Sequence, residues 1–170
     1  MKAQKCIFVV SMCLTFGLHA VKADRGDMFL SVMPMVSPFT SSEAMFGGGL
    51  NLSMGANERT EIQFELDWTA QPGYFDNQGF TETRYLIGSL FTPYFGDIRP
   101  RFGGSFGLIH ALGSGGVSEV GFNTGVHLQG LWDLSQAVRL FAEANPNFSF
   151  GKYADLSTLI KVGMQFRLTK

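Results

Sequence analysis

The chain has 170 residues, with 13 Lys and Arg against 14 Asp and Glu and a formal net charge of −1. This length corresponds to about one domain. The near-neutral charge balance excludes the broad basic surface that a nucleic-acid partner requires.

The first 23 residues have the pattern of a secretory signal peptide. Lys2 and Lys5 precede a short apolar run, Ile7–Leu18, and small residues lead up to Ala23. Such a run is too short to span a membrane as a helix. We therefore expect residues 1–23 to be removed on export and residues 24–170 to form one mature domain.

Cleavage after Ala23 changes the composition of the chain. It removes both cysteines and three of the 13 basic residues but none of the 14 acidic ones, which leaves a formal charge of −4. The mature chain therefore has no disulfide and no thiol chemistry. No apolar run in it approaches the ~20 residues that a spanning helix needs, so a membrane location requires strands.

Eight segments of the mature chain alternate between apolar and polar residues, as β-strands do. In chain order they are Met28–Val36, Ala44–Ala56, Thr60–Ala70, Thr83–Pro93, Arg99–Leu112, Glu119–Asp133, Ala137–Phe150 and Ser157–Leu168. Membrane strands need ~9–11 residues, whereas soluble strands average ~5–6. The lengths of the segments favour membrane strands.

The connections between these segments alternate in length. Short ones are expected at Asn57–Arg59, Tyr94–Ile98 and Asp133–Gln136, and longer polar or Gly-rich ones at Ser37–Glu43, Gln71–Glu82, Gly113–Glu119 and Gly151–Leu156. This rhythm is typical of an up-and-down meander with tight turns at one end and longer loops at the other.

The strand TEIQFELDWTA, Thr60–Ala70, has one apolar face and one face with three carboxylates. In a soluble barrel of lipocalin type the apolar face points inward. In an outer-membrane barrel it meets lipid and the carboxylates line the lumen. Alternation alone does not distinguish the two arrangements.

The first feature that favours the membrane barrel is the set of charges on the polar faces. A narrow interior requires small residues and ionised groups that neutralise each other. The expected network in the lumen consists of Glu61, Glu65, Asp67, Arg84, Arg99, Arg101, His127, Arg139, Glu143, Lys161 and Arg167.

The second feature is the position of the aromatic residues near strand ends, where membrane interfaces concentrate them. With the N-terminus in the periplasm, an outer belt contains Phe46, Trp68, Tyr85, Phe122, Phe148 and Phe150. A periplasmic belt contains Phe91, Phe102, Trp132 and Phe166.

The third feature is the lack of charge on the apolar faces, where His110 is the one ionisable residue. Lys or Arg on the lipid face at the bilayer midplane costs about 2–4 kcal/mol, which explains this pattern. We therefore predict an all-β fold, an eight-stranded antiparallel up-and-down transmembrane β-barrel.

The last strand, KVGMQFRL, resembles the barrel-assembly signal of small outer-membrane barrels of the OmpA/OmpX/OmpW type. The matching positions are Lys161, Gly163, Phe166 and Leu168, although the chain ends in Thr169–Lys170 rather than in an aromatic residue. The resemblance implies location in the cell outer membrane, contact with its lipid, and recognition by periplasmic chaperones and the barrel-assembly machinery.

Within that group the chain is most similar to the OmpW-like branch, whose narrow barrels are associated with passage of small hydrophobic molecules. An apolar part of the lumen suits such a role, and it consists of Leu86, Leu90, Leu131 and Phe141. Pro34 and Pro146 cannot donate a hydrogen bond to the strand ladder, so they are candidate positions for an interruption of the ladder and a sideways opening of the wall.

Three features of the sequence are candidates for a chemical site. His127 faces the lumen with Glu143 or Asp67 as a partner, but no Ser stands beside it in a recognisable motif, so we interpret it as a hydrogen-bonded interior histidine. His110 and Glu119 flank one loop and fall short of a zinc ligand set. The Gly-rich stretches lead into no helix, which excludes a phosphate loop.

The leading functional hypothesis is a narrow channel or permeability protein for small hydrophobic solutes. The alternative is a structural or adhesin-like surface protein that binds an extracellular partner through its loops. A lipid-modifying barrel enzyme comes third. We expect no enzyme activity, no cofactor and no metal.

Overall fold

The computed structural model describes residues 25–39, 44–73, 79–113 and 115–169. The expected signal peptide, residues 1–23, lies outside these ranges. Among the described residues, no helix is long and apolar enough to cross a membrane.

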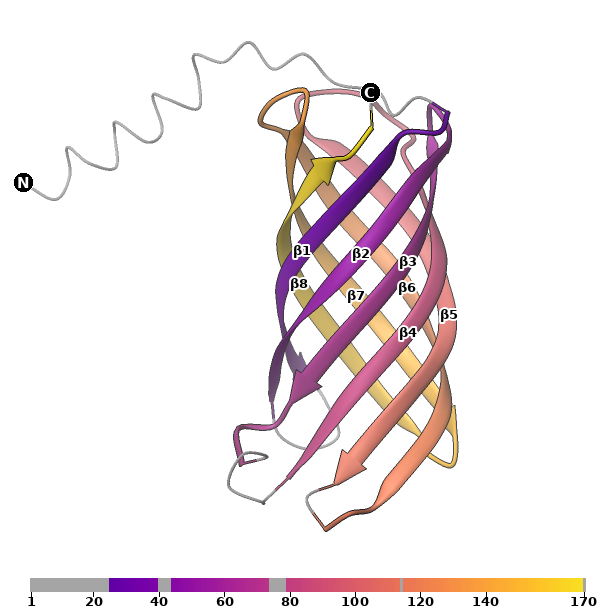
Figure 1. Ribbon diagram of the computed structural model, residues 1–170, viewed down its shortest axis with the longest axis vertical. Helices are drawn as coiled ribbons and strands as arrows, with labels where there is room; N and C mark the ends of the chain where they lie inside the picture. The colour runs from indigo at the N-terminus through magenta and orange to yellow at the C-terminus, as the bar shows by residue number, and fades with distance from the viewer. Residues whose placement is uncertain (1–24, 40–43, 74–78, 114, 170) are drawn as a thin grey trace, which may run out of the picture.

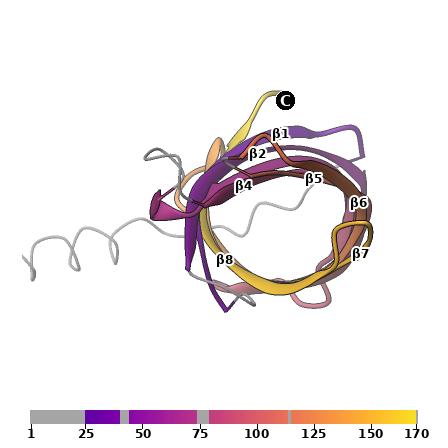
Figure 2. The same ribbon diagram turned by 90° about the horizontal axis from the view of Figure 1, so that it is seen from below.

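Eight antiparallel strands form a closed barrel with up-and-down order (Figure 1; Figure 2 shows the ring from below), which confirms the predicted fold class. The strands are β1 (Met28–Phe39), β2 (Met45–Asn57), β3 (Thr60–Ala70), β4 (Phe80–Phe91), β5 (Arg99–Gly113), β6 (Ser118–Asp133), β7 (Val138–Gly151) and β8 (Asp155–Arg167). Each strand pairs with its neighbours in the chain, and β1 pairs with β8 to close the ring.

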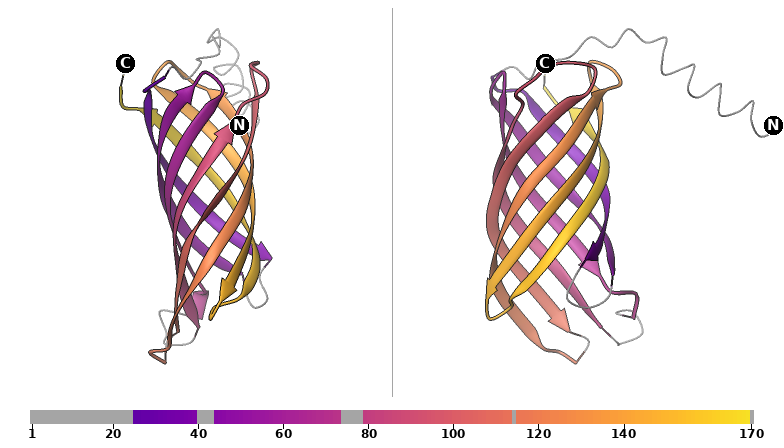
Figure 3. Two further views of the ribbon diagram at one scale, coloured as in Figure 1. Left: turned by 90° about the vertical axis from the view of Figure 1, so that its right-hand side faces the viewer. Right: turned by 180° about the vertical axis from the view of Figure 1, so that it is seen from behind.

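β1 begins and β8 ends at the same end of the barrel, as the views from the side show (Figure 3). Following the orientation expected from the sequence, we call this the periplasmic end and the opposite one the outer end. The strands are strongly tilted and run the full length of the molecule between the two ends.

Two of the expected long connections are wrong. The strands leave only residues 114–117 between β5 and β6, and 152–154 between β7 and β8. The ladder continues into the supposed loops, because Ser118 pairs with Leu112 and Asp155 pairs with Ser149. At the periplasmic end, the short link that was expected at Tyr94–Ile98 is longer than predicted and comprises residues 92–98.

The faces of the strands point as expected for a membrane barrel. Along β3, Phe64, Leu66 and Trp68 are 55%, 42% and 39% exposed, whereas Glu65 and Asp67 are buried. Large apolar side chains are exposed in the same way on all eight strands. A folded soluble protein does not display such a continuous apolar surface, so the outer wall is built for contact with lipid.

The outward aromatic residues extend over more of the wall than two belts. Rings of the expected outer belt meet, with Phe122 and Phe150 stacked 5.6 Å apart. On the periplasmic side the centroids of Phe91 and Phe102 are 6.3 Å apart. However, exposed Phe64 and Phe106 lie in the middle of their strands, so the aromatic residues are not confined to the ends.

The strand ladder is interrupted at Pro146, one of the two prolines at which the sequence indicated a sideways opening of the wall, but a side chain bridges the gap. The β6–β7 register on either side places Pro146 opposite Val126, and no paired residues occur between Gly125 and Leu128. Proline has no N–H to donate. The side-chain amide of Asn145 donates instead to the Val126 carbonyl, with Nδ2 and O 3.0 Å apart. The interruption therefore stays bridged.

Candidate functional site: the charged interior

The middle of the lumen holds one cation among three carboxylates. Lys161 on β8 reaches across the barrel to β3, where its Nζ bonds to Glu65 and lies 2.8 Å from Asp67 Oδ2. The same Nζ is 3.5 Å from Glu143 Oε1 on β7. Lys161 and Asp67 have no exposed area. We call Glu65, Asp67, Glu143, Lys161 and His127 the central cluster.

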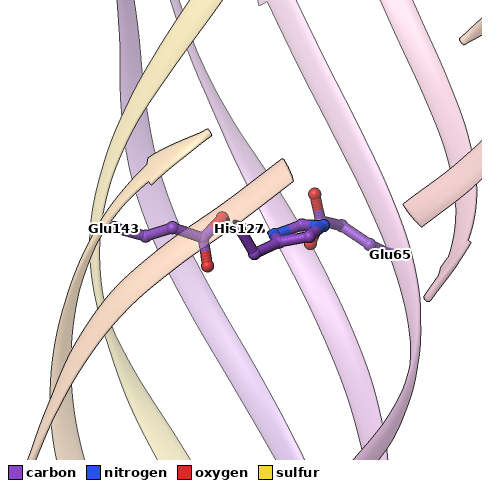
Figure 4. Close-up of side chains that lie close together, drawn as sticks. All are labelled: Glu65, His127 and Glu143. Atoms are coloured by element: carbon purple, nitrogen blue, oxygen red, sulfur yellow. Dashed lines mark hydrogen bonds and ion pairs between the residues drawn. The ribbon is translucent and has the colours of Figure 1, made fainter. Parts of the chain in front are cut away.

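His127 completes the central cluster from β6. Its Nδ1 is 2.9 Å from Glu143 Oε1, and Figure 4 shows the imidazole between Glu143 and Glu65. Its Nε2 is 2.8 Å from Ser105 Oγ and 3.3 Å from Gln63 Nε2. No sequence motif places a Ser beside His127, but the fold brings Ser105 into contact with it. Ser105 is distant in sequence, and the β5–β6 register brings it there.

The Ser105, His127 and Glu143 contacts have the order of a hydrolase triad. All three side chains are buried, and His127 has no exposed area at all. These buried contacts fix the orientation of the imidazole.

A second group of charges fills the periplasmic end. Glu61 pairs with Arg101 at 2.7 Å and with Arg139 at 3.4 Å. Asp133 pairs with Arg99 and lies 3.3 Å from Arg139. At the rim, the half-buried Arg167 pairs with Asp27 at 2.5 Å. Sequence reasoning missed both aspartates because they stand at or outside the strand ends.

A third group lies toward the outer end. Arg84 pairs with Glu82, and the hydroxyl of Tyr153 donates to the same carboxylate. Burial, together with the charge of Glu82, raises the pKa of Tyr153 above its ordinary value. The sequence indicates a loop at Glu82, so its ion pair with Arg84 was not predicted. The sequence predicted that Arg84 would face acidic residues, but not that its partner would be Glu82.

The expected apolar lumen residues are all buried, but they form part of a packed core. Leu131 and Phe141 belong to one cluster with Met33, Met35 and Leu159. Leu86 and Leu90 on β4 are 4% and 2% exposed. Sequence reasoning missed the β1 and β8 members, because β1 alternates weakly and places Met side chains inward.

Two hollows in the surface of the described residues lie away from the central cluster. One, of about 370 Å³, lies at the periplasmic rim beside Gln136 and Arg167. Another, of about 550 Å³, lies on the wall beside Phe46 and Trp68. The charged side chains of the central cluster and the residues of the apolar cluster are buried within the lumen.

The remaining motif residues are placed as follows. In the assembly-signal strand, Lys161 and Gly163 point inward, Phe166 is 37% exposed on the outer wall, and Leu168 follows the end of β8. His110 lies 2.8 Å from Ser118 Oγ near the outer rim.

Comparisons with solved structures show the same fold. Neisserial surface protein A superposes with a TM-score of 0.65 at 13% identity, covering 84% of this chain and 96% of that one. OprG of Pseudomonas aeruginosa gives 0.59 at 9% identity, covering 89% and 100%. Ail of Yersinia pestis in a nanodisc gives 0.56 at 14% identity, covering 85% and 100%.

These likenesses are to small outer-membrane barrels, as the sequence indicated, and at such identities they show the fold alone. A scan of protein-family models and a search of curated proteins find no match.

Proposed function

We propose that this protein is a non-conducting outer-membrane barrel that acts as a structural or surface-interaction protein at its outer end. The observation that carries the proposal is the closed central cluster, in which Asp67, His127 and Lys161 have no exposed area. A solute passing this layer has to separate buried ion pairs, and breaking one such pair costs about 3–5 kcal/mol.

The same proposal includes the route to the membrane. Residues 1–23 direct export, periplasmic chaperones carry the chain, and the assembly machinery reads β8 and delivers the barrel to outer-membrane lipid. The names of two similar structures describe a surface protein and an attachment invasion locus protein. The fold is therefore compatible with a surface role, although a fold does not determine a function.

The competing hypothesis is the narrow channel for small hydrophobic solutes, of the OmpW-like kind, whose basis is the buried apolar set Leu86, Leu90, Leu131 and Phe141. Leu131 and Phe141 pack in the apolar cluster with Met33, Met35 and Leu159, and this is the reason for preferring the closed barrel. The proposal also makes the protein no enzyme, because Ser105 Oγ is buried in the wall of the lumen.

Solute flux into proteoliposomes that hold refolded protein tests the proposal, with small apolar and small polar probes compared. We expect both fluxes to equal those of protein-free liposomes, while a porin reconstituted in parallel conducts. The faster gel migration of an unboiled sample verifies folding.

Apolar flux above the protein-free level would contradict the proposal and favour the channel. In that event Leu86→Trp, which fills the lumen, should reduce the flux. Leu134→Trp is the matched control, because Leu134 is exposed at the periplasmic turn.

A further inference from the structure

The central cluster contains three side chains of the types that bind transition metals. One ligand atom each from Glu65, His127 and Glu143 lies within 4.8 Å of the other two, and all three side chains are buried. They come from β3, β6 and β7 and converge in the lumen (Figure 4). We propose that they bind one divalent ion of the zinc class, which accepts imidazole nitrogen and carboxylate oxygen as ligands.

The charge of the cluster supports a divalent ion. Its three carboxylates face one ammonium group, that of Lys161. When all three carboxylates are ionised and the imidazole is neutral, two negative charges are in excess, and uncompensated buried charge is costly. Lys161 is held most closely by Glu65 and Asp67 and stands farther from Glu143. One divalent ion neutralises the excess.

An unpaired oxygen lies in the same cluster. Asp67 bonds to Lys161 through Oδ2, whereas its Oδ1 is buried and accepts no hydrogen bond. Buried carboxylate oxygens are normally satisfied by donors or metals. The Asp67 carboxylate can remain the ion-pair partner of Lys161 when a metal ion draws Glu65 and Glu143 together.

The neighbours of the ligands already fix their orientation. His127 Nε2 is held by Ser105 Oγ, which leaves Nδ1 directed at Glu143. Gln129 Nε2 donates to Glu143 Oε2 at 2.9 Å. Such outer contacts fix the orientation of the imidazole and of the carboxylate. Gln63 Nε2 also lies 3.3 Å from His127 Nε2 and can only donate to it, so Nδ1 carries the proton in this arrangement and releases it when the ion binds.

The closed lumen determines how the ion enters. The charged groups on both sides of the central cluster are buried, so a hydrated ion that enters after the barrel has formed must displace them. We therefore expect uptake during folding and slow release afterwards.

Refolding the mature chain with an equimolar amount of Zn²⁺ or Co²⁺ tests the inference. Excess metal is removed with a chelator after folding, and bound metal is measured by elemental analysis. We expect about one ion per barrel, a tetrahedral d–d absorption band for Co²⁺, and no ion when the chelator is present from the start.

Variants separate the site from other carboxylates. His127→Gln and Glu143→Gln should each lower the bound metal at least tenfold. Glu82→Gln is the matched control, because Glu82 is equally buried but pairs with Arg84 outside the cluster, and it should retain the ion. Gel migration selects folded samples, and Glu65→Gln replaces any variant that does not fold.

Two results would overturn the site. One is folded wild-type protein that retains less than about a tenth of an ion per barrel. The other is metal content that is unchanged in the folded variants or is stripped by chelator after folding, which indicates surface binding only. Flux is a separate measurement, so failure of this site leaves the proposed closed barrel untouched.

Discussion

Lys161 is the residue on which the charge balance of the interior depends most. Its ammonium contacts Glu65, Asp67 and Glu143 from a position with no exposed area. Burial of three carboxylates around one cation is tolerable only while the cation is present, because an unpaired buried charge loses its hydration without replacement.

Lys161→Met should therefore lower the free energy of unfolding by about 3–5 kcal/mol. Urea unfolding in lipid vesicles, followed by gel migration, measures it. Adding Asp67→Asn to Lys161→Met should recover part of the loss, because one unpaired charge disappears. If the double variant were less stable than Lys161→Met alone, the ion-pair explanation would be wrong.

Asn145 has a different task, since it supplies the donor that Pro146 lacks. Asn145→Ala leaves the Val126 carbonyl without its side-chain partner, and we expect a loss of about 1–3 kcal/mol of stability. Pro146→Ala restores a backbone N–H at this position. In that background Asn145→Ala should cost clearly less. An equal cost in both backgrounds would contradict the bridging role.

At the scale of the strand, close approach of β4 and β5 depends on glycine at particular positions, among them Gly103 and Gly107. A Cβ added to Gly103 would lie 1.7 Å from the Ser89 carbonyl oxygen, which is backbone and cannot move aside. A Cβ added to the adjacent Gly104 would meet only the Gly125 carbonyl oxygen at 3.5 Å, an ordinary contact. Two neighbouring glycines thus have unequal roles.

Gly103→Ala should lower the free energy of unfolding of the barrel by at least the ~1–3 kcal/mol that is typical of overpacking. Gly104→Ala should change stability by less than about 0.5 kcal/mol. The folded fraction by gel migration and the urea midpoint compare the two. Equal effects would show that β4 and β5 adjust more freely than their register suggests.

Alternation was sufficient to predict the strands and which residues share a face, because a period of two residues is a local property. The direction of the faces required the pattern of charges and aromatic residues as well. The β3 segment, Thr60–Ala70, was predicted with its observed bounds. Pairing across the lumen was not predictable. Lys161 meets Glu65 and Asp67 only because eight tilted strands close with one particular stagger, and the meeting of Ser105 with His127 depends on the β5–β6 register.

At the scale of the whole molecule, the fold is an inverted one, with charge inside and apolar groups outside. The two tryptophans report on this arrangement, because Trp68 points outward near the outer end and Trp132 is half-buried near the periplasmic end. Both belong to interfaces where aromatic rings meet lipid headgroups.

Brominated lipids should therefore quench the fluorescence of both residues. Vesicles with bromine close to the headgroup should quench more strongly than vesicles with bromine near the acyl-chain ends. Trp68→Phe and Trp132→Phe isolate the two signals. Absence of quenching in a folded sample would contradict the outward placement and favour a soluble barrel.

The position of Lys161 also constrains how the protein is made. The carboxylates that it contacts on β3 lie 96 and 94 residues earlier in the chain. A growing sheet that lacks β8 holds these carboxylates without their cation, and transfer of that sheet into hydrocarbon is opposed by the cost of desolvating them. The strands are synthesised one after another, but we expect them to enter the bilayer together. Insertion then has to wait for β8, because β8 carries the cation that neutralises the carboxylates of β3.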